Sequence, residues 1–125
     1  MRLLLDTHIF LWAVAGSPLL KPAARRLLES ADQVFVSAAS IWEVAIKARL
    51  GKIDADPHAL AGAIEGSGFH ELAVRAIHAA GVSSLERHHN DPFDRLLIAQ
   101  AMTEPLRLVT ADAVLAQYSD LVMLV

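Results

Sequence analysis

The segment Arg2–Trp12, RLLLDTHIFLW, places three leucines directly before an aspartate, Asp6. A short, uninterrupted apolar run is typical of a parallel strand buried on both faces, and open α/β sheets bind their ligands beyond the carboxyl ends of such strands. After Asp6, the spacing of Ile9, Phe10 and Trp12 changes to that of a helix. Asp6 is therefore predicted at a strand-to-helix turn, where it can either cap the helix or bind a ligand.

Short apolar runs continue to alternate with helical spacing along the rest of the chain. Strands are predicted at 34–36, 69–72, 106–109 and 121–125, and helices at 23–30, 41–48, 58–65, 93–101 and 113–117. The stretch 74–89 is less regular and is predicted to form a short helix and a polar loop. This order predicts an α/β fold, a three-layer α/β/α sandwich with a mainly parallel sheet, and residues 1–125 are expected to form a single domain.

Composition limits the classes of function. The chain has 125 residues, 54% of them hydrophobic, and no cysteine, which excludes disulfides and thiolate zinc sites and makes the cytoplasm the expected compartment. No apolar run approaches the roughly 20 residues needed to span a bilayer, so no membrane association is expected. The net charge of -3 is the wrong sign for binding nucleic acid by bulk electrostatics. Any contact with nucleic acid must then depend on a local basic patch or a metal.

Four carboxylates occupy positions that favour a shared site. Asp6 and Asp112 follow strands, Asp94 lies in the first turn of a helix, and Glu43 lies within an apolar helix, where a carboxylate must be exposed, paired or bound to a cation. Converging carboxylates repel one another unless a cation lies among them. An oxygen-only ligand set favours Mg²⁺ or Mn²⁺, and such a centre suits phosphodiester hydrolysis.

Each of these acids also has an ordinary structural interpretation. Asp6 and Asp91 can cap helices, Asp94 can complement a helix dipole, and Asp112 can be a turn residue. Glu43 can face solvent, as most helical glutamates do. Only the set of acids points to chemistry.

The neighbouring polar and aromatic residues are interpreted more simply. Thr110 can hydrogen-bond a phosphate or only its own turn. Ser37 and Ser40 can line a site or cap the following helix, and capping is preferred for both. Trp12 and Trp42 are predicted in the core. Of the histidines, His8 can border the Asp6 site, whereas the adjacent His88 and His89 diverge and make no metal-ligand pair.

Four segments, in order, resemble the motifs of PIN-domain nucleases, and of VapC-type toxins of prokaryotic toxin–antitoxin pairs in particular. They are LLLDTHIFLW at 3–12, SAASIWEVAIKARLGKI at 37–53, HHNDPFDRLLIAQA at 88–101 and LVTADAVLAQY at 108–118. The resemblance implies an α/β/α sandwich, Mg²⁺- or Mn²⁺-dependent endoribonuclease activity on RNA, a homodimer and neutralisation by a small cognate antitoxin.

The resemblance also assigns the site residues. The family's four acids match Asp6, Glu43, Asp94 and Asp112, with the metal held by Asp6 and Asp94. Thr110 matches the hydroxyl beside the last acid. Asp91 is a second acid near Asp94 and is assigned a supporting role, because Asp94 opens DRLLIAQA as the family's third acid does.

Two other functions remain compatible with the residues: a Mg²⁺-binding, phospho-accepting signalling domain, and an interaction module without catalysis whose apolar excess is covered by a partner. The nuclease interpretation needs a basic rim on an acidic chain. The candidate residues for this rim are Arg25, Arg26, Lys47, Arg49, Lys52, Arg87 and Arg95.

Overall fold

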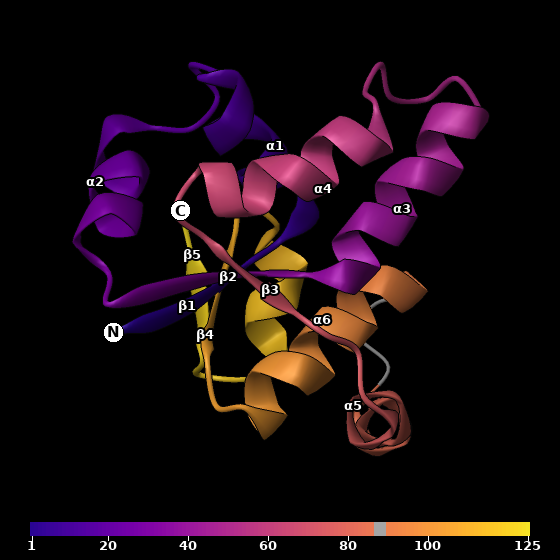
Figure 1. The fold of residues 1–125 in the computed structure, drawn as a ribbon. Helices are drawn as coiled ribbons and strands as arrows, with labels where there is room; N and C mark the ends of the chain where they lie inside the picture. Colours follow the sequence, from indigo (N-terminus) through magenta and orange to yellow (C-terminus); the bar gives the residue numbers. More distant parts are fainter. Residues whose placement is uncertain (87–89) are drawn as a thin grey trace.

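The computed structural model describes residues 1–86 and 90–125. Five parallel strands form one sheet in the order β3-β2-β1-β4-β5 (Figure 1). The strands are β1 (Arg2–Leu5), β2 (Gln33–Ser37), β3 (His70–Leu72), β4 (Arg107–Thr110) and β5 (Val122–Leu124). The parallel sheet predicted from the sequence is confirmed, with strand ends displaced by at most one residue.

The three leucines of β1 determine the layers. Successive side chains of a strand point to opposite faces, and all three leucines are fully buried. Leu3 and Leu5 pack into one core with residues of α1 (Thr7–Ala15), α2 (Pro22–Ser30) and α4 (Pro57–Gly66). Leu4 packs on the other face against Leu97 and Ile98 of α6 (Pro92–Thr103). Because helices cover both faces of the sheet, the predicted three-layer α/β/α sandwich is confirmed (Figure 1).

The remaining elements lie around these layers. Helix α3 (Ala38–Arg49) directly follows β2 and packs against α1, α4 and α6. Helix α5 (Ala76–Gly81) lies beside α6, and two short 3₁₀ helices, η1 (Val82–Ser84) and η2 (Ala113–Gln117), complete the chain. Among the residues that the structure describes, no helix is both long and apolar enough to cross a membrane.

Glycine and proline mark the ends of three helices. Gly16 ends α1 with φ of +63°, and Gly51 follows α3 with φ of +73°, the left-handed conformation that glycine adopts without strain. Pro92 occupies the first turn of α6, after Asp91 as N-cap.

The predicted core position of Trp42 is wrong, since 61% of its surface is exposed. Adjacent helix residues point about 100° apart. Because Glu43 takes the inward position on α3, Trp42 turns outward and packs edge-on against Phe93, with 5.1 Å between ring centroids. Trp12 is partly buried and packs against the core, closer to its prediction.

Candidate active site

The candidate site lies at the carboxyl ends of β1, β2 and β4. Asp6 directly follows β1, and Ser37 and Thr110 end β2 and β4. From β1 the chain continues to β2 and β3 on one side, whereas β4 and β5 lie on the other, so the boundary of β1 and β4 is the topological switch point where α/β sheets bind ligands. The backbone N–H of Asp6 donates to the carbonyl of Val109 at 3.0 Å, which fixes Asp6 at this boundary.

Asp6 caps a helix and also binds a residue of a neighbouring strand. Its side chain is 5% exposed, and Oδ1 accepts a hydrogen bond from the backbone N–H of His8 at 2.7 Å, which caps α1. Oδ2 accepts from the hydroxyl of Thr110 at 2.6 Å. The same hydroxyl oxygen accepts from the backbone N–H of Asp112 at 3.1 Å. Thr110 therefore connects the first acid to the segment that carries the fourth.

Glu43 is buried, so its solvent-facing alternative is wrong. Its side chain is bound at both oxygens: Oε1 accepts from the hydroxyl of Thr7 at 2.7 Å and Oε2 from Nζ of Lys47 at 2.5 Å. The hydrogen bond to Glu43 raises the pKa of Lys47, with a further contribution from the charges of Asp91 and Asp94. The buried glutamate is thus paired with a cation, one of the three arrangements predicted from its apolar surroundings.

The two serines differ in role. Ser37 caps α3 as predicted, accepting from the backbone N–H of Ala39 at 3.0 Å. The capping role predicted for Ser40 is wrong. Ser40 lies inside the first turn of α3, on the same face as Glu43 three residues on, and its hydroxyl lies 3.0 Å from that of Thr7. Since the hydroxyl hydrogen of Thr7 is directed to Glu43, Ser40 donates to Thr7.

The pKa of Asp94 indicates that the predicted acids lie close to one another. It lies in the first turn of α6 and is partly buried. Several causes raise the pKa of Asp94 to about 7: first its burial, then the charges of Asp91, Asp6, Glu43 and Asp112. The structure thus brings all four predicted acids, and Asp91, into one electrostatic neighbourhood.

The ordinary roles of two acids are confirmed alongside this convergence. Asp91 caps α6, since Oδ1 accepts from the backbone N–H groups of Phe93 at 2.8 Å and Asp94 at 3.3 Å. Asp112 caps η2 by accepting from the backbone N–H of Val114 at 3.0 Å. These hydrogen bonds hold both carboxylates in place at the edge of the site.

The donor chemistry fits a hard divalent cation. All the candidate ligands are carboxylate or hydroxyl oxygens, and their mutual repulsion is relieved by positive charge. In the described ranges 1–86 and 90–125, no three acidic or histidine side chains stand close enough together to hold one ion. Mg²⁺ and Mn²⁺ are commonly held through one or two protein carboxylates and keep several waters.

The residues proposed for a basic rim differ in their contacts. The guanidinium of Arg95 donates to the carbonyls of Val82 at 3.2 Å and Glu86 at 3.0 Å and to the hydroxyl of Tyr118 at 3.3 Å. Lys47 is partly exposed, and its ammonium group binds the carboxylate of Glu43. Exposed side chains remain at Arg26, Arg49 and Lys52, whereas Arg87, His88 and His89 lie outside the described residues.

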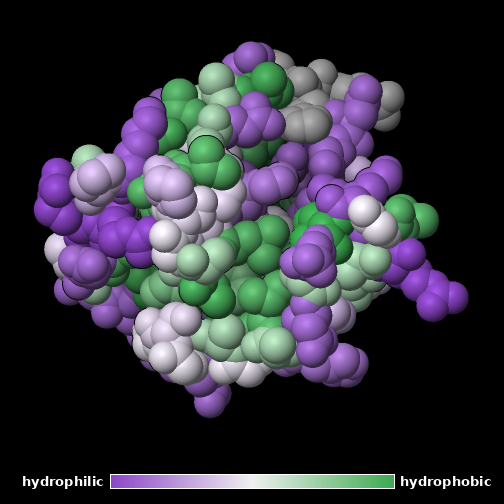
Figure 2. Space-filling model, turned by 90° about the horizontal axis from the view of Figure 1, so that it is seen from above, coloured by the Kyte–Doolittle hydropathy of each residue, from purple (hydrophilic) through white to green (hydrophobic). Residues whose placement is uncertain are grey.

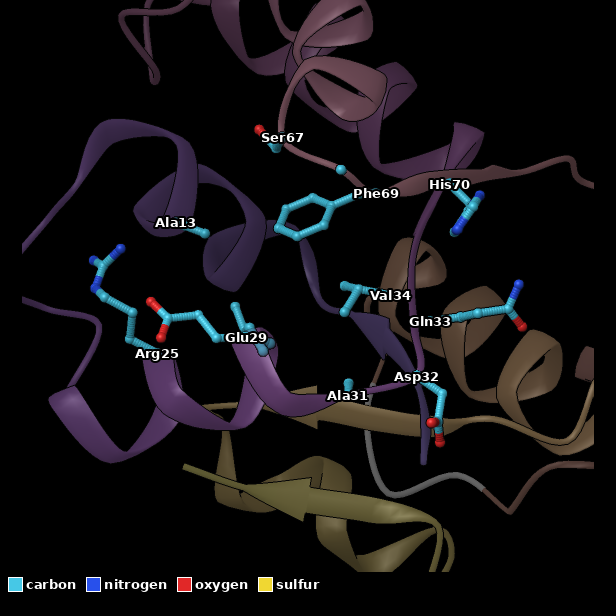
Figure 3. A pocket seen from close by; sticks show the side chains of 12 residues that line it. Ala13, Arg25, Glu29, Ala31, Asp32, Gln33, Val34, Ser67, Phe69 and His70 are labelled. Carbon is cyan, nitrogen blue, oxygen red and sulfur yellow. The ribbon is translucent and has the colours of Figure 1, made fainter.

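Two hollows differ in their position relative to the acids. A cavity of about 370 Å³ opens at the amino-terminal ends of β2 and β3, where Phe69, Val34 and Arg25 border it (Figure 3). Its lining, among described residues, includes neither Asp94 nor any of the four acids near it. A second hollow of about 440 Å³ is lined by Asp6 and Asp112 together with His8, which confirms that His8 borders the Asp6 site.

The comparisons with known proteins agree with this geometry. The family model described as PIN domain matches residues 3–121. The chain belongs to the PIN-domain family. A curated relative, ribonuclease VapC22 of Mycobacterium tuberculosis, is 32% identical over 112 residues, covering 87% of this chain and 85% of the relative. The VapC resemblance of the four sequence segments is confirmed by this relative.

Two solved structures share the fold of this PIN domain. A toxin–antitoxin complex from Klebsiella pneumoniae superposes with a TM-score of 0.69 at 20% identity, covering 96% of this chain and 94% of that one. VapBC2 from Rickettsia felis, bound to a DNA fragment from its promoter, gives a TM-score of 0.68 at 15% identity, covering 100% and 98%.

Sequence reasoning missed two partners of Glu43 in this PIN domain. The local patterns give no role to Thr7 and indicate Lys47 only as part of a basic rim. The spacing of Glu43 and Lys47, four residues apart on one helix, is the signal that predicts their pairing. No comparable local signal marks Thr7, whose contact with α3 depends on the packing of two helices.

Proposed function

We propose that this PIN domain is a divalent-metal-dependent endoribonuclease and the toxin of a toxin–antitoxin pair. The observation that carries the proposal is the convergence of four carboxylates, those of Asp6, Glu43, Asp91 and Asp112, near Asp94. Its burial and these four charges raise the pKa of Asp94 to about 7. A cluster of this kind is unfavourable without a cation, and such a cation is what phosphodiester hydrolysis uses. The ribonuclease name of the curated relative supports RNA as the substrate.

In this proposal Asp6 and Asp94 hold Mg²⁺ or Mn²⁺. Thr110 and the N–H of His8 fix the carboxylate of Asp6, and each of its oxygens keeps acceptor capacity beyond the one hydrogen bond described. When bound, the ion supplies Lewis-acid stabilisation of phosphoryl oxygens and activation of water at neutral pH. Thr110 acts as a positioning residue for Asp6.

Glu43 and Asp112 complete the acidic pocket and orient the attacking water. Thr7 and Lys47 hold Glu43 in one position, so its carboxylate cannot swing away when substrate enters. Lys47 also places one positive charge beside the pocket, which reduces the repulsion between the acids and the incoming phosphate.

The partners in this proposal are a cognate antitoxin and a second copy of the chain, in the cytoplasm. Both solved relatives come from toxin–antitoxin assemblies. The surface offers apolar area to protein partners: a groove of about 330 Å³ between α1 and α4 has Leu11, Val14 and Ile53 in its lining. Hydrophobic residues gather on the face seen from above in Figure 2. Trp42 on α3 and Leu50, the residue that caps the end of this helix, are each more than half exposed.

The direct test is cleavage of a panel of RNAs with Mg²⁺, Mn²⁺ or a chelator. Asp6→Ala and Asp94→Asn should each abolish metal-dependent cleavage, with an unchanged circular dichroism spectrum. Asp120→Asn is the matched control. Asp120 is exposed and precedes β5, so it lies at the amino-terminal end of that strand, whereas the site lies at the carboxyl ends of β1, β2 and β4. Full cleavage by the Asp6→Ala, Asp94→Asn double variant would contradict the proposal.

A further inference from the structure

The hollow beside Asp6 has a composition that the metal site alone does not require. About 440 Å³ in volume, it is lined by Asp6, His8, Trp12, Ala111, Asp112 and Ala113. Two acids of the proposed centre therefore share one cavity with two aromatic side chains. This arrangement places a ring surface directly beside the position of the reacting phosphate.

The two rings form one wall of the cavity. His8 and Trp12 lie one turn apart on α1 and so project from the same face of the helix. Their ring centroids are 6.2 Å apart with 51° between the planes. His8 is exposed and Trp12 only partly buried, so both rings have surface available to a ligand.

Small side chains complete the lining of the cavity. Ala111 and Ala113 flank Asp112 in the turn after β4, and both are exposed. We call this cavity the slot. It combines aromatic rings and methyl groups with the carboxylates of Asp6 and Asp112.

We propose that this slot is a base-binding subsite for single-stranded RNA, an inference that rests on the proposed function. A nucleobase next to the scissile phosphate stacks on Trp12, with His8 and the alanines beside it. Proteins that bind unpaired RNA stack bases on aromatic rings in this way, whereas bases within a duplex are already stacked and unavailable.

Connectivity favours a base over a peptide as the occupant. The scissile phosphate of the proposed reaction must lie near Asp6, and the nucleotide attached to it must lie within one backbone step. The cavity shares Asp6 and Asp112 with the proposed centre, so it lies within that step. No such constraint brings a peptide segment to Trp12.

Fluorescence provides a test that does not depend on activity. The chain has two tryptophans, so Trp42→Phe leaves Trp12 as the only one. In a non-cleaving Trp42→Phe, Asp94→Asn protein, a single-stranded oligoribonucleotide should quench Trp12 fluorescence, and a ribose-phosphate oligomer of equal length without bases should not. Binding of labelled RNA, followed by anisotropy, without quenching of Trp12 would overturn the subsite.

Kinetics provide the second test. Trp12→Leu should raise KM for single-stranded RNA about 5- to 150-fold, the effect expected from losing one stacked base, with a smaller change in kcat. Trp12→Phe keeps a ring and should stay close to wild type. An unchanged KM for Trp12→Leu would overturn the subsite, as would loss of antitoxin neutralisation without any change in KM, which indicates a peptide site. Should Trp12→Leu fail to fold, the fluorescence of Trp12 in the Trp42→Phe, Asp94→Asn protein decides.

The two proposals fail in distinguishable ways. Absence of metal-dependent RNA cleavage by the wild-type protein overturns the proposed function and the subsite with it. Metal-dependent cleavage that is insensitive to Trp12→Leu overturns the subsite alone.

Discussion

The hydroxyl of Thr110 donates to Oδ2 of Asp6 at 2.6 Å, across 104 residues of sequence. This hydrogen bond joins the ends of β1 and β4 at the switch point of the sheet, and both residues are buried. Removing the hydroxyl leaves a buried carboxylate oxygen without this donor. The position of Asp6 therefore depends on a residue that need not touch substrate.

We expect Thr110→Val to lower the free energy of unfolding by about 1–3 kcal/mol, because a buried charged acceptor loses its partner. Urea unfolding measures this change. Thr110→Ser restores the hydroxyl and should recover most of the loss. Thr103→Val is the control, since Thr103 is exposed on α6 and its change should stay within about 0.5 kcal/mol. Equal losses at both positions would contradict a special role for Thr110.

The raised pKa of Asp94 predicts how the stability of the metal-free protein depends on pH. The pKa of Asp94 is about 7 in the folded state, against an ordinary aspartate value of 3.8, so the folded state binds more protons between these values. The contribution of Asp94 is fully present below about pH 4 and is lost as pH rises through about 7. In chelator, Asp94→Asn should therefore gain Tm relative to wild type as pH increases over this window.

The same comparison should reverse when Mg²⁺ is added at about pH 8, above the raised pKa of Asp94. Ligand binding to the folded state stabilises it, so wild type should gain Tm while Asp94→Asn gains little. A parallel Tm shift of both proteins with Mg²⁺ would show that Asp94 does not contribute to binding the ion.

The ion pair between Lys47 and Glu43 should contribute to the stability of the folded protein. Lys47→Met leaves a buried carboxylate without its cation, and we expect a loss of about 1–3 kcal/mol, less than for a fully buried pair because Lys47 is 29% exposed. In the background of Glu43→Gln, the same Lys47→Met change should cost much less. A double-mutant cycle by urea unfolding measures the difference, and additive losses would contradict direct coupling.

Arg95 allows the rim hypothesis to be tested by salt dependence. Its guanidinium binds two backbone carbonyls and the hydroxyl of Tyr118, so it is expected to stabilise the segments before α6 and after η2 without binding phosphate. Arg95→Met should lower stability but leave the slope of log KM against log salt unchanged. A reduction of that slope by about one would instead assign Arg95 a phosphate contact.

Local sequence patterns were sufficient to predict the strands and helices and the position of single acids within them. The leucine run before Asp6 predicted a buried strand, and Pro92 with Asp91 predicted the start of α6, because strand burial and helix capping depend on near neighbours in sequence. The resemblance of four ordered segments added the PIN-domain family. The errors at Trp42 and Ser40 arose because periodicity alone does not say which face of α3 points inward.

The sequence by itself determined the succession of strands and helices along the chain, the acid at the end of β1 and the family. Tertiary structure decided which distant groups meet: Thr110 with Asp6, Thr7 with Glu43, and Arg95 with other parts of the chain. The physical reason is that propensity and capping act over a few residues, whereas these hydrogen bonds require separate segments of the chain to pack first. Local sequence thus places Asp6 at the end of β1, and contacts between distant residues fix its side chain in the site.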